Sequence, residues 1–183
     1  MENTEQQMID VARQGKAEGY KYLMGRYGRQ IQLLVAQMVP DARDVEELTQ
    51  DVFVRVFEHL RLFNFKSSFS TWLYRIAYNH AISFARHKRQ LLYVIDENRL
   101  RKVSNDEVEQ MEATADNEQQ IEALARAINR LDAEERALIT LFYYKERSGA
   151  ECAEIMAQSE NNIKVRLHRI RKKLYILIQD ETK

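Results

Sequence analysis

The sequence predicts an all-α protein made of two small helical domains joined by an acidic linker. Pro40 is the only proline, and the chain from Asp41 to Ser148 contains neither glycine nor proline, which argues against hairpins and for helices. Apolar residues recur at every third or fourth position through much of the chain. Acidic and basic residues are segregated along it, although the formal net charge is zero. The 183 residues suffice for two domains of this kind.

The N-terminal third of the chain predicts three helices. Residues 6–39 read as two helices, whose apolar positions at helical spacing are Leu23, Tyr27, Ile31, Leu34, Val35 and Met38. Residues 41–63 predict a strongly amphipathic helix, whose apolar face carries Val45, Leu48, Val52, Val56, Leu60 and Phe63. A flanking face of the same helix carries Asp44, Glu47, Asp51 and Glu58.

The next segment combines aromatic rings with cations. No Asp or Glu occurs from His59 to Ile95. Residues 64–70 form a polar, Ser-rich break, and residues 71–89 predict a helix with Ser70 or Thr71 as its N-cap. Rings interleaved with cations suit single-stranded nucleic acid, because bases stack on the rings while cations follow the backbone. The alternative is that most of these rings belong to the core, and periodicity leaves both interpretations open. The polar side chains expected to be exposed are Asn64, Lys66, Arg75, Asn79, Ser83 and Arg86.

An acidic segment separates this helix from the C-terminal part. From Asp96 to Glu122 nine acidic residues oppose three basic ones, and the clean periodicity is lost. We therefore expect an N-terminal domain over residues 1–92, a linker over 93–118 and a C-terminal domain over 119–183. Helical periodicity resumes over 121–144, 148–157 and 160–178. A domain of about 60 residues buries only about 60% of its unfolded surface, so the C-terminal domain is expected to be marginally stable alone.

The last two helices have the pattern of a helix-turn-helix. A short helix is followed by a turn at Gln158 and Ser159 and then by a basic helix. In such a motif the start of the second helix reaches base edges in the major groove. Asn161 and Asn162 are suited to adenine edges, and Lys164 and Arg166 to guanine or phosphate. The basic charge therefore predicts DNA binding rather than only a solvated face.

Other classes of function find little support. The single cysteine, Cys152, excludes an internal disulfide and is expected to be a small buried core residue rather than a redox sensor. The four histidines lack ligand spacing, so no metal or other cofactor is expected. No nucleophile–base set or phosphate-binding loop indicates an enzyme. No apolar run is long enough for membrane insertion and the N-terminus lacks the pattern of a signal peptide, so a cytoplasmic location is expected.

Two blocks of the sequence carry a family resemblance. DARDVEELTQDVFVRVFEHLRLF, followed by FSTWLYRIAYNHAISFAR, resembles region 2 of bacterial sigma factors. LDAEERALITLFYYKERSGAECAEIMAQSENNIKVRLHRIRKKL resembles their region 4. No third domain fits between the blocks, which is the layout of the extracytoplasmic-function (ECF) group. In that group the turn usually carries Gly and an apolar residue where Ala157 and Gln158 stand, and a left-handed backbone is less favourable for Ala.

The resemblance implies roles and partners. It implies binding to core RNA polymerase, promoter DNA as duplex and melted strand, and an anti-sigma factor. Polymerase docking is implied for Asp44, Glu47, Leu48, Gln50 and Asp51. The loop over residues 64–70 would capture a flipped base, and contacts to the minus-ten element are implied for Asn64, Lys66, Ser67, Arg75, Asn79, Ser83 and Arg86. Contacts to the minus-thirty-five element are implied for Ser159, Asn161, Asn162, Lys164, Arg166 and Arg169.

The expected function is therefore that of an ECF sigma factor, which directs promoter recognition, DNA melting and initiation. The alternative is a stand-alone helix-turn-helix regulator that acts without the polymerase core. That alternative predicts a dimer with a ligand pocket, and it leaves the acid-free aromatic segment unexplained. A helical adaptor protein without a nucleic-acid function would leave the role of both basic segments unexplained.

Overall fold

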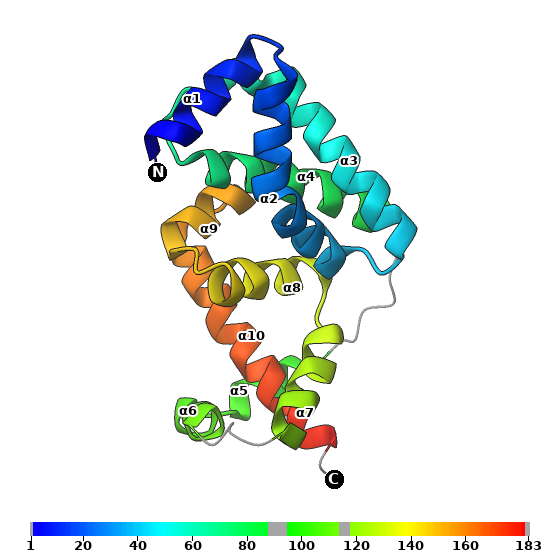
Figure 1. Ribbon diagram of the computed structural model, residues 1–183. Helices are drawn as coiled ribbons and strands as arrows, with labels where there is room; N and C mark the ends of the chain where they lie inside the picture. Colours follow the sequence, from blue (N-terminus) through cyan, green and yellow to red (C-terminus); the bar gives the residue numbers. More distant parts are fainter. Residues whose placement is uncertain (1, 88–94, 114–117, 182–183) are drawn as a thin grey trace.

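The computed structural model describes residues 2–87, 95–113 and 118–181, and every regular element within these ranges is helical. The N-terminal elements are α1 (Glu2–Arg13), α2 (Ala17–Met38), α3 (Ala42–His59), the 3-10 turn η1 (Leu60–Leu62) and α4 (Phe69–His87). Two short helices follow, α5 (Glu97–Lys102) and α6 (Asn105–Ala113). The C-terminal elements are α7 (Glu118–Asn129), α8 (Ala133–Ile139), the π-helical turn η2 (Thr140–Tyr144), α9 (Gly149–Met156) and α10 (Glu160–Glu181). The predicted all-α class is confirmed (Figure 1).

The N-terminal helices form where the apolar periodicity predicts them. The Asp41 side chain accepts hydrogen bonds from the backbone N–H groups of Arg43 and Asp44, which starts α3. The apolar face of α3 then lies in the core against α2 and α4. Ser68, rather than Ser70 or Thr71, precedes α4, and its Oγ accepts from the Thr71 N–H at 3.1 Å. The expected N-cap was therefore misplaced by at least two residues.

The helix expected over residues 121–144 is broken in the structure. Asp132 starts a new helix by a reciprocal capping box, in which its carboxylate accepts from the Glu135 N–H at 2.8 Å and the Glu135 carboxylate accepts from the Asp132 N–H. α7 therefore ends at Asn129 and α8 begins at Ala133. The periodic apolar residues on both sides of the break made the segment look continuous in the sequence.

The C-terminal motif has the expected two helices and tight turn. Ser148 caps α9 through a second capping box with Glu151. Ala157 ends α9 in the left-handed region, at φ 53° and ψ 47°. The next N–H, of Gln158, donates to the Ala153 carbonyl oxygen at 2.9 Å, which closes the helix end in the manner of a Schellman motif. Ala157 thus adopts the conformation usually given to glycine, and its side chain is exposed.

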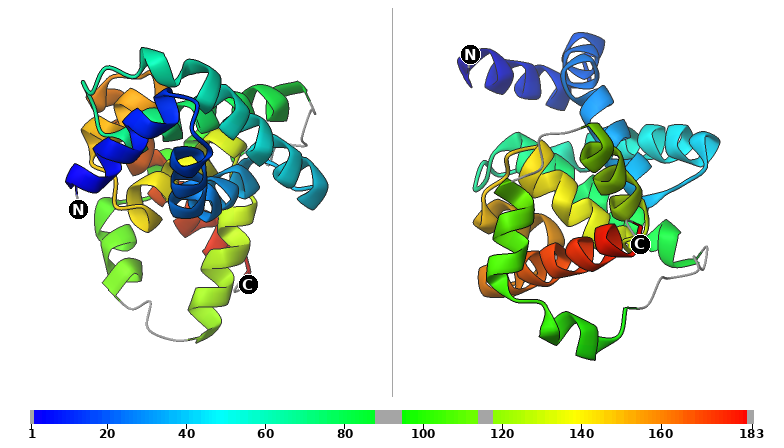
Figure 2. Two further views of the ribbon diagram at one scale, coloured as in Figure 1. Left: turned by 45° about the horizontal axis from the view of Figure 1, so that its top comes forward. Right: turned by 90° about the horizontal axis from the view of Figure 1, so that it is seen from below.

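The segment expected to be the linker contributes α5 and α6, which pack against α10. Ile95, Leu100, Val103 and Val108 are buried there. These helices lie with α7 beside the C-terminal half of α10, at the end of the molecule away from α1 (Figures 1 and 2). The apolar residues are too far apart in sequence to give a helical stripe, which is why the pattern alone did not indicate helices.

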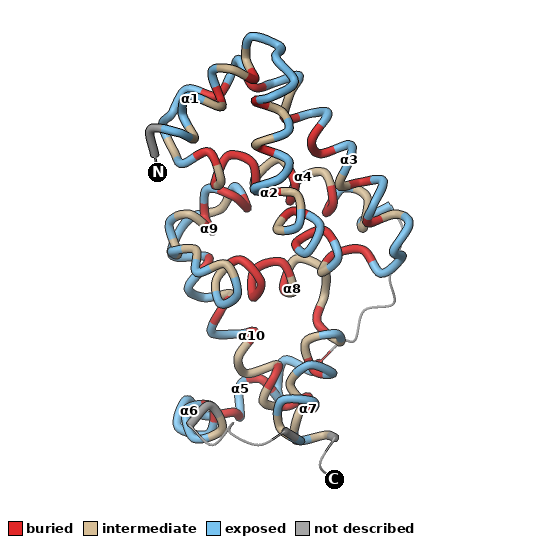
Figure 3. Tube along the Cα trace, in the orientation of Figure 1, coloured by how far each residue is buried: buried red, intermediate tan, exposed pale blue. Residues whose placement is uncertain are grey.

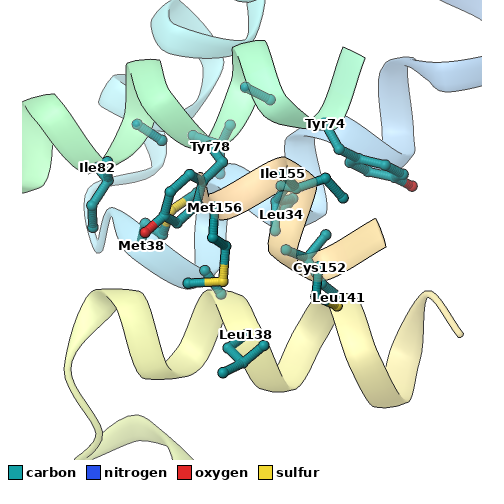
Figure 4. Close-up of a cluster of buried hydrophobic side chains, with 14 of the residues drawn as sticks. Leu34, Met38, Tyr74, Tyr78, Ile82, Leu138, Leu141, Cys152, Ile155 and Met156 are labelled. Atoms are coloured by element: carbon teal, nitrogen blue, oxygen red, sulfur yellow. The ribbon is translucent and has the colours of Figure 1, made fainter. Parts of the chain in front are cut away.

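The N-terminal and C-terminal helices share one continuous core. α4 packs against α9 and α8, and α2 packs against α8. Figure 4 shows the centre of this contact, and the side chains labelled there are Leu34, Met38, Tyr74, Tyr78, Ile82, Leu138, Leu141, Cys152, Ile155 and Met156. Figure 3 shows buried residues on α4, α8 and α9, the helices that meet in this contact. The C-terminal helices therefore bury apolar surface against α2 and α4 as well as among themselves. Within the described ranges no helix is both long enough and apolar enough to cross a membrane.

Candidate nucleic-acid interface

One face of α4 presents the polar side chains expected to contact DNA. Arg75, Asn79 and Ser83 are spaced four residues apart, so they line up along the helix, and Arg86 follows one turn later. Asn79, Ser83 and Arg86 are exposed, and the Arg75 side chain is 42% exposed. An open cleft of about 600 Å³ runs along this face, between α4 and α3.

The structure decides which aromatic rings lie in the core. Phe69, Trp72, Tyr74 and Tyr78 are all less than 9% exposed, so they are not available for stacking with bases. Phe65 differs, because it is 44% exposed and lies in the loop before α4. The core interpretation therefore holds for these helix rings, while Lys66, Arg86 and the loop ring of Phe65 face outward. Binding of single-stranded nucleic acid by this segment stays a prediction.

The loop over residues 64–70 is short and internally hydrogen-bonded. The Asn64 carbonyl Oδ1 accepts from the Lys66 N–H at 3.2 Å, which is an Asx turn. Ser68 closes the loop by capping α4. Asn64 and Lys66 are exposed and Ser67 is half-buried, so these three predicted site residues lie at the surface next to Phe65 in the sequence.

The second basic surface lies at the start of α10. The Ser159 Oγ accepts from the Asn162 N–H at 3.2 Å and so starts the helix. Asn161, Asn162 and Lys164 are exposed, as the sequence predicts for a recognition helix. Lys164 is 3.0 Å from Glu160, an exposed ion pair of small energetic weight. The Arg166 side chain is only 20% exposed, so it is less available than expected.

Glu134 holds two of the predicted DNA-binding arginines. Its carboxylate accepts from Arg86 of α4 at 2.7 Å and from Arg166 of α10 at 3.1 Å. Burial opposes ionisation of Glu134, but the hydrogen bonds and positive charge of the two arginines outweigh burial and lower its pKa. One carboxylate therefore serves as the charged hydrogen-bond acceptor for both arginines.

Two other arginines of the predicted site also meet acidic side chains. Arg75 is 4.0 Å from Glu154 of α9, and Arg169 pairs with Glu97 of α5. The acids come from α5, α8 and α9, whereas the arginines come from α4 and α10. The basic faces of the chain are therefore partly neutralised by its own carboxylates.

The acidic face of α3 is exposed in most of its predicted positions. Glu47, Gln50 and Asp51 are exposed, and Asp44 is half-buried. Leu48 does not fit the surface role that the resemblance implied, because it is 4% exposed and belongs to the core. Its spacing with Val45 and Val52 placed it on the apolar face from the start. The docking surface that the structure allows consists of the four polar residues.

No metal centre or reactive thiol accompanies these surfaces in the described ranges. No group of three or more potential ligands comes together there. Cys152 is fully buried, and burial raises the pKa of its thiol to about 12. A protonated, inaccessible thiol is a poor nucleophile, as expected for a core residue.

Sequence reasoning did not identify Glu134 or Arg13 as residues of these surfaces. Glu134 lies between Asp132 and Glu135, and nothing in its spacing distinguishes it from other helix-surface acids. Arg13 reaches the carbonyl oxygens of Leu60 and Phe63, which are 47 and 50 positions away in sequence. Contacts over such separations leave no local signal in one sequence.

Comparison with known proteins agrees with this architecture. Residues 23–90 match the family model "Sigma-70 region 2", and residues 121–174 match "Sigma-70, region 4". The chain therefore belongs to the sigma-70 family of bacterial sigma factors, which are non-enzymatic, DNA-binding transcription initiation factors.

Its relatives define the group within that family. The chain is 27% identical to the ECF RNA polymerase sigma factor SigW of Bacillus subtilis, over 98% of this chain and 100% of the relative. It is 29% identical to the ECF RNA polymerase sigma-E factor of Escherichia coli K12, over 92% and 91% of the two chains. The sigma factor RpoE, solved in complex with the anti-sigma factor NepR from Bartonella quintana, shares its fold, with a TM-score of 0.63, 19% identity and coverage of 87% and 96%. The protein is a member of the ECF group of sigma factors.

Proposed function

We propose that this chain binds core RNA polymerase and directs it to promoters, where the complex melts DNA and starts transcription. The observation that carries the proposal is the occurrence of both sigma regions in one chain, each with an exposed polar helix face suited to DNA. We assign residues 1–92 to polymerase docking and the minus-ten element, 93–118 to the linker, and 119–183 to the minus-thirty-five element.

In this proposal three separate surfaces bind the polymerase, the minus-ten element and the minus-thirty-five element. The acidic face of α3, with Glu47 and Asp51 exposed, docks on the polymerase. The loop before α4 captures a flipped base, and the α4 face follows the melted minus-ten strand. The start of α10 enters the major groove of the minus-thirty-five duplex, where Asn161 and Asn162 are suited to adenine.

The energy of melting supports a partnership with polymerase over solitary action. Opening about 10 base pairs costs about 1.4 kcal/mol per stacking step, or roughly 14 kcal/mol in all. Each captured base returns about 1–3 kcal/mol by stacking. One loop and one helix cannot hold such a bubble, so the chain directs a larger machine that supplies the remaining contacts.

The closed packing of the helices implies that the chain opens when it acts. The minus-ten and minus-thirty-five elements lie about 25 base pairs apart, which is about 85 Å along B-DNA. In the structure α4 packs directly against α9, the helix that precedes the recognition helix α10. The two DNA-reading helices cannot span both elements in this arrangement. We infer that the free chain is closed, binds promoter DNA poorly, and opens on core polymerase.

An anti-sigma factor is the proposed inhibitory partner, acting in the cytoplasm where the polymerase works. The structural relative from Bartonella quintana was solved with such a partner. We propose that the partner of this chain covers residues 45–63 or 161–169, because polymerase docking and promoter reading depend on these two surfaces. A complex that leaves both surfaces accessible to polymerase and DNA would contradict this assignment.

The test is run-off transcription on genomic fragments with purified bacterial core polymerase, with and without the chain. The proposal expects new, specific transcripts that are lost with Asp51→Arg. Glu18→Arg is the matched control, because Glu18 is exposed in the first turn of α2, outside the predicted docking surface, and the charge change is the same. Absence of transcripts together with tight, specific duplex binding by the chain alone would support the stand-alone regulator instead.

A further inference from the structure

The last residue of α1 contacts the backbone at both ends of η1. Arg13 Nε donates to the Leu60 carbonyl oxygen at 3.2 Å, and its Nη2 donates to the Phe63 carbonyl oxygen. The Leu60 carbonyl oxygen also accepts from the Phe63 backbone N–H at 3.2 Å. Carbonyl oxygens at the end of a helical turn carry partial negative charge, which favours a cation beside them. The planar guanidinium serves two of them at once, which a single ammonium group cannot do in the same geometry.

The same guanidinium lies over the ring of Phe65. Its central carbon is 4.8 Å from the ring centroid, and the Phe63 ring is 4.7 Å from that centroid. Phe65 has a φ of 58°, in the left-handed region that is unfavourable for a side chain of this size. Such a conformation persists only where surrounding contacts impose it. The Arg13 guanidinium and the Phe63 ring are among these contacts, and with both in place Phe65 is 44% exposed.

The position of Phe65 determines where its neighbours point. Asn64 and Lys66 flank it directly, and the Asx turn between them encloses it. From the α4 side the loop is held by the Ser68 cap and by the buried Phe69 ring. From the η1 side the long-range support is the Arg13 side chain.

The Arg13 guanidinium makes all its polar contacts in this arrangement within the protein. Its third nitrogen, Nη1, is 3.1 Å from the Asp10 carboxylate, so each of its three nitrogens has an intramolecular acceptor. Its side chain is 23% exposed. It is therefore oriented toward the loop backbone rather than toward a phosphate.

We propose that Arg13 is a positioning residue for base capture: its forked contact with the Leu60 and Phe63 carbonyl oxygens and its stacking on Phe65 hold the loop in the shape that discriminates the flipped base. This inference rests on the proposed function of the loop and assigns to α1 a part in minus-ten specificity.

The test compares Arg13→Gln and Arg13→Lys with the wild-type chain on core polymerase, using templates in which each minus-ten base is varied in turn. Both variants are expected to reduce the preference for the captured base at least about fivefold, while preferences in the minus-thirty-five element stay unchanged. Lysine is expected to fail because it keeps the charge but not the fork. Arg26→Gln is the control, because Arg26 also joins α1 to its neighbours, through Glu5 at 3.0 Å, without touching the loop.

Three results would overturn the inference. They are an unchanged base preference in Arg13→Gln, full activity and preference in Arg13→Lys, and an equal loss on all templates, which would indicate a phosphate contact or general instability. Thermal unfolding of each variant shows whether an equal loss on all templates comes from general instability.

A second measurement separates this inference from the proposed function. Amide hydrogen exchange of Lys66, whose N–H is bonded to Asn64, is expected to accelerate at least about tenfold in Arg13→Gln and to stay unchanged in Arg26→Gln. If the wild-type chain directs no initiation, the proposed function fails, and this exchange still decides whether Arg13 holds the loop. Equal exchange in Arg13→Gln and wild type would show that it does not.

Discussion

Replacing Glu134 by Gln tests whether the closed arrangement shields the DNA-binding faces. The change keeps the size of the side chain and removes the charge that binds Arg86 of α4 and Arg166 of α10. Of these two contacts, the Arg86 contact joins the N-terminal to the C-terminal helices, whereas the Arg166 contact lies within the C-terminal helices. We expect the variant to open more readily and to bind DNA more tightly.

The magnitude follows from exposure and charge. The Arg86 side chain is 68% exposed and that of Glu134 is 28% exposed, so their ion pair contributes about 0.2–1 kcal/mol. Without the carboxylate that both arginines contact, their like charges repel by an amount on the order of 1 kcal/mol at a dielectric between surface and bulk values. The closed state should therefore lose about 1–2 kcal/mol, which raises the opening equilibrium roughly 5–30-fold.

The assay is fluorescence anisotropy with a labelled non-promoter duplex at fixed, low salt. When the competent state is a minor one, the apparent dissociation constant is inversely proportional to the population of that state, so the fold-change in affinity does not depend on the starting population. Glu122→Gln is the matched control, because it removes the same charge from an exposed ion pair within α7. Energy transfer between dyes on Lys21 and Gln179, both exposed, detects the opening directly.

Two outcomes would refute this reasoning. Equal tightening by Glu134→Gln and Glu122→Gln would mean that net charge, rather than release of the faces, determines the affinity. Unchanged affinity and unchanged energy transfer would mean that packing around Tyr78 and Met156 alone keeps the helices closed.

Further predictions concern stability and accessibility. Ala157→Gly should stabilise the chain by about 0.5–1 kcal/mol in urea unfolding, because relief of the left-handed strain, about 1–2 kcal/mol, exceeds the entropic cost of glycine; a loss of stability would contradict the left-handed turn. Leu48→Ala should cost about 2–5 kcal/mol and Glu47→Ala less than about 0.5 kcal/mol, which would place Leu48 in the core rather than at the polymerase. The Cys152 thiol should react with an alkylating reagent only when the chain opens or unfolds, and rapid labelling under native conditions would refute its burial. Because the folded-state pKa of Glu134 is lowered, its stabilising contribution is complete above the ordinary glutamate value of 4.5 and is lost as pH falls below it; acid titration of unfolding should be shallower for Glu134→Gln.

The fold could be predicted to the extent that it depends on local pattern. The apolar stripe through Val45 and Val52 specifies α3 and its buried face. The break at Asp132 was missed because a capping box with Asp is weaker as a signal than an apolar stripe that continues beyond it. Leu48 shows the opposite error, since its periodicity indicated the core and the family resemblance alone suggested the surface.

The candidate site could be predicted residue by residue but not in its pairing. Asn79, Ser83 and Asn161 are exposed because polar residues opposite an apolar stripe face water. That Arg86 and Arg166 meet the same carboxylate depends on how α4, α8 and α10 pack, which follows from the whole core. Pairing between elements distant in sequence has no period, so no pattern in one sequence reports it.

The acids of α5, α8 and α9 give the segregation of charge a structural meaning. A chain that must bind DNA only on polymerase needs basic faces that are strong in the complex and weak in the free state. Pairing those faces with its own carboxylates achieves this, because each pair is partly exposed and therefore costs little to break. A single buried charge network would hold the chain closed too firmly, since breaking one leaves uncompensated charges. Such weak pairs add little to the cost of separating the apolar contact between α4, α8 and α9, and the binding energy of a large partner must exceed that cost.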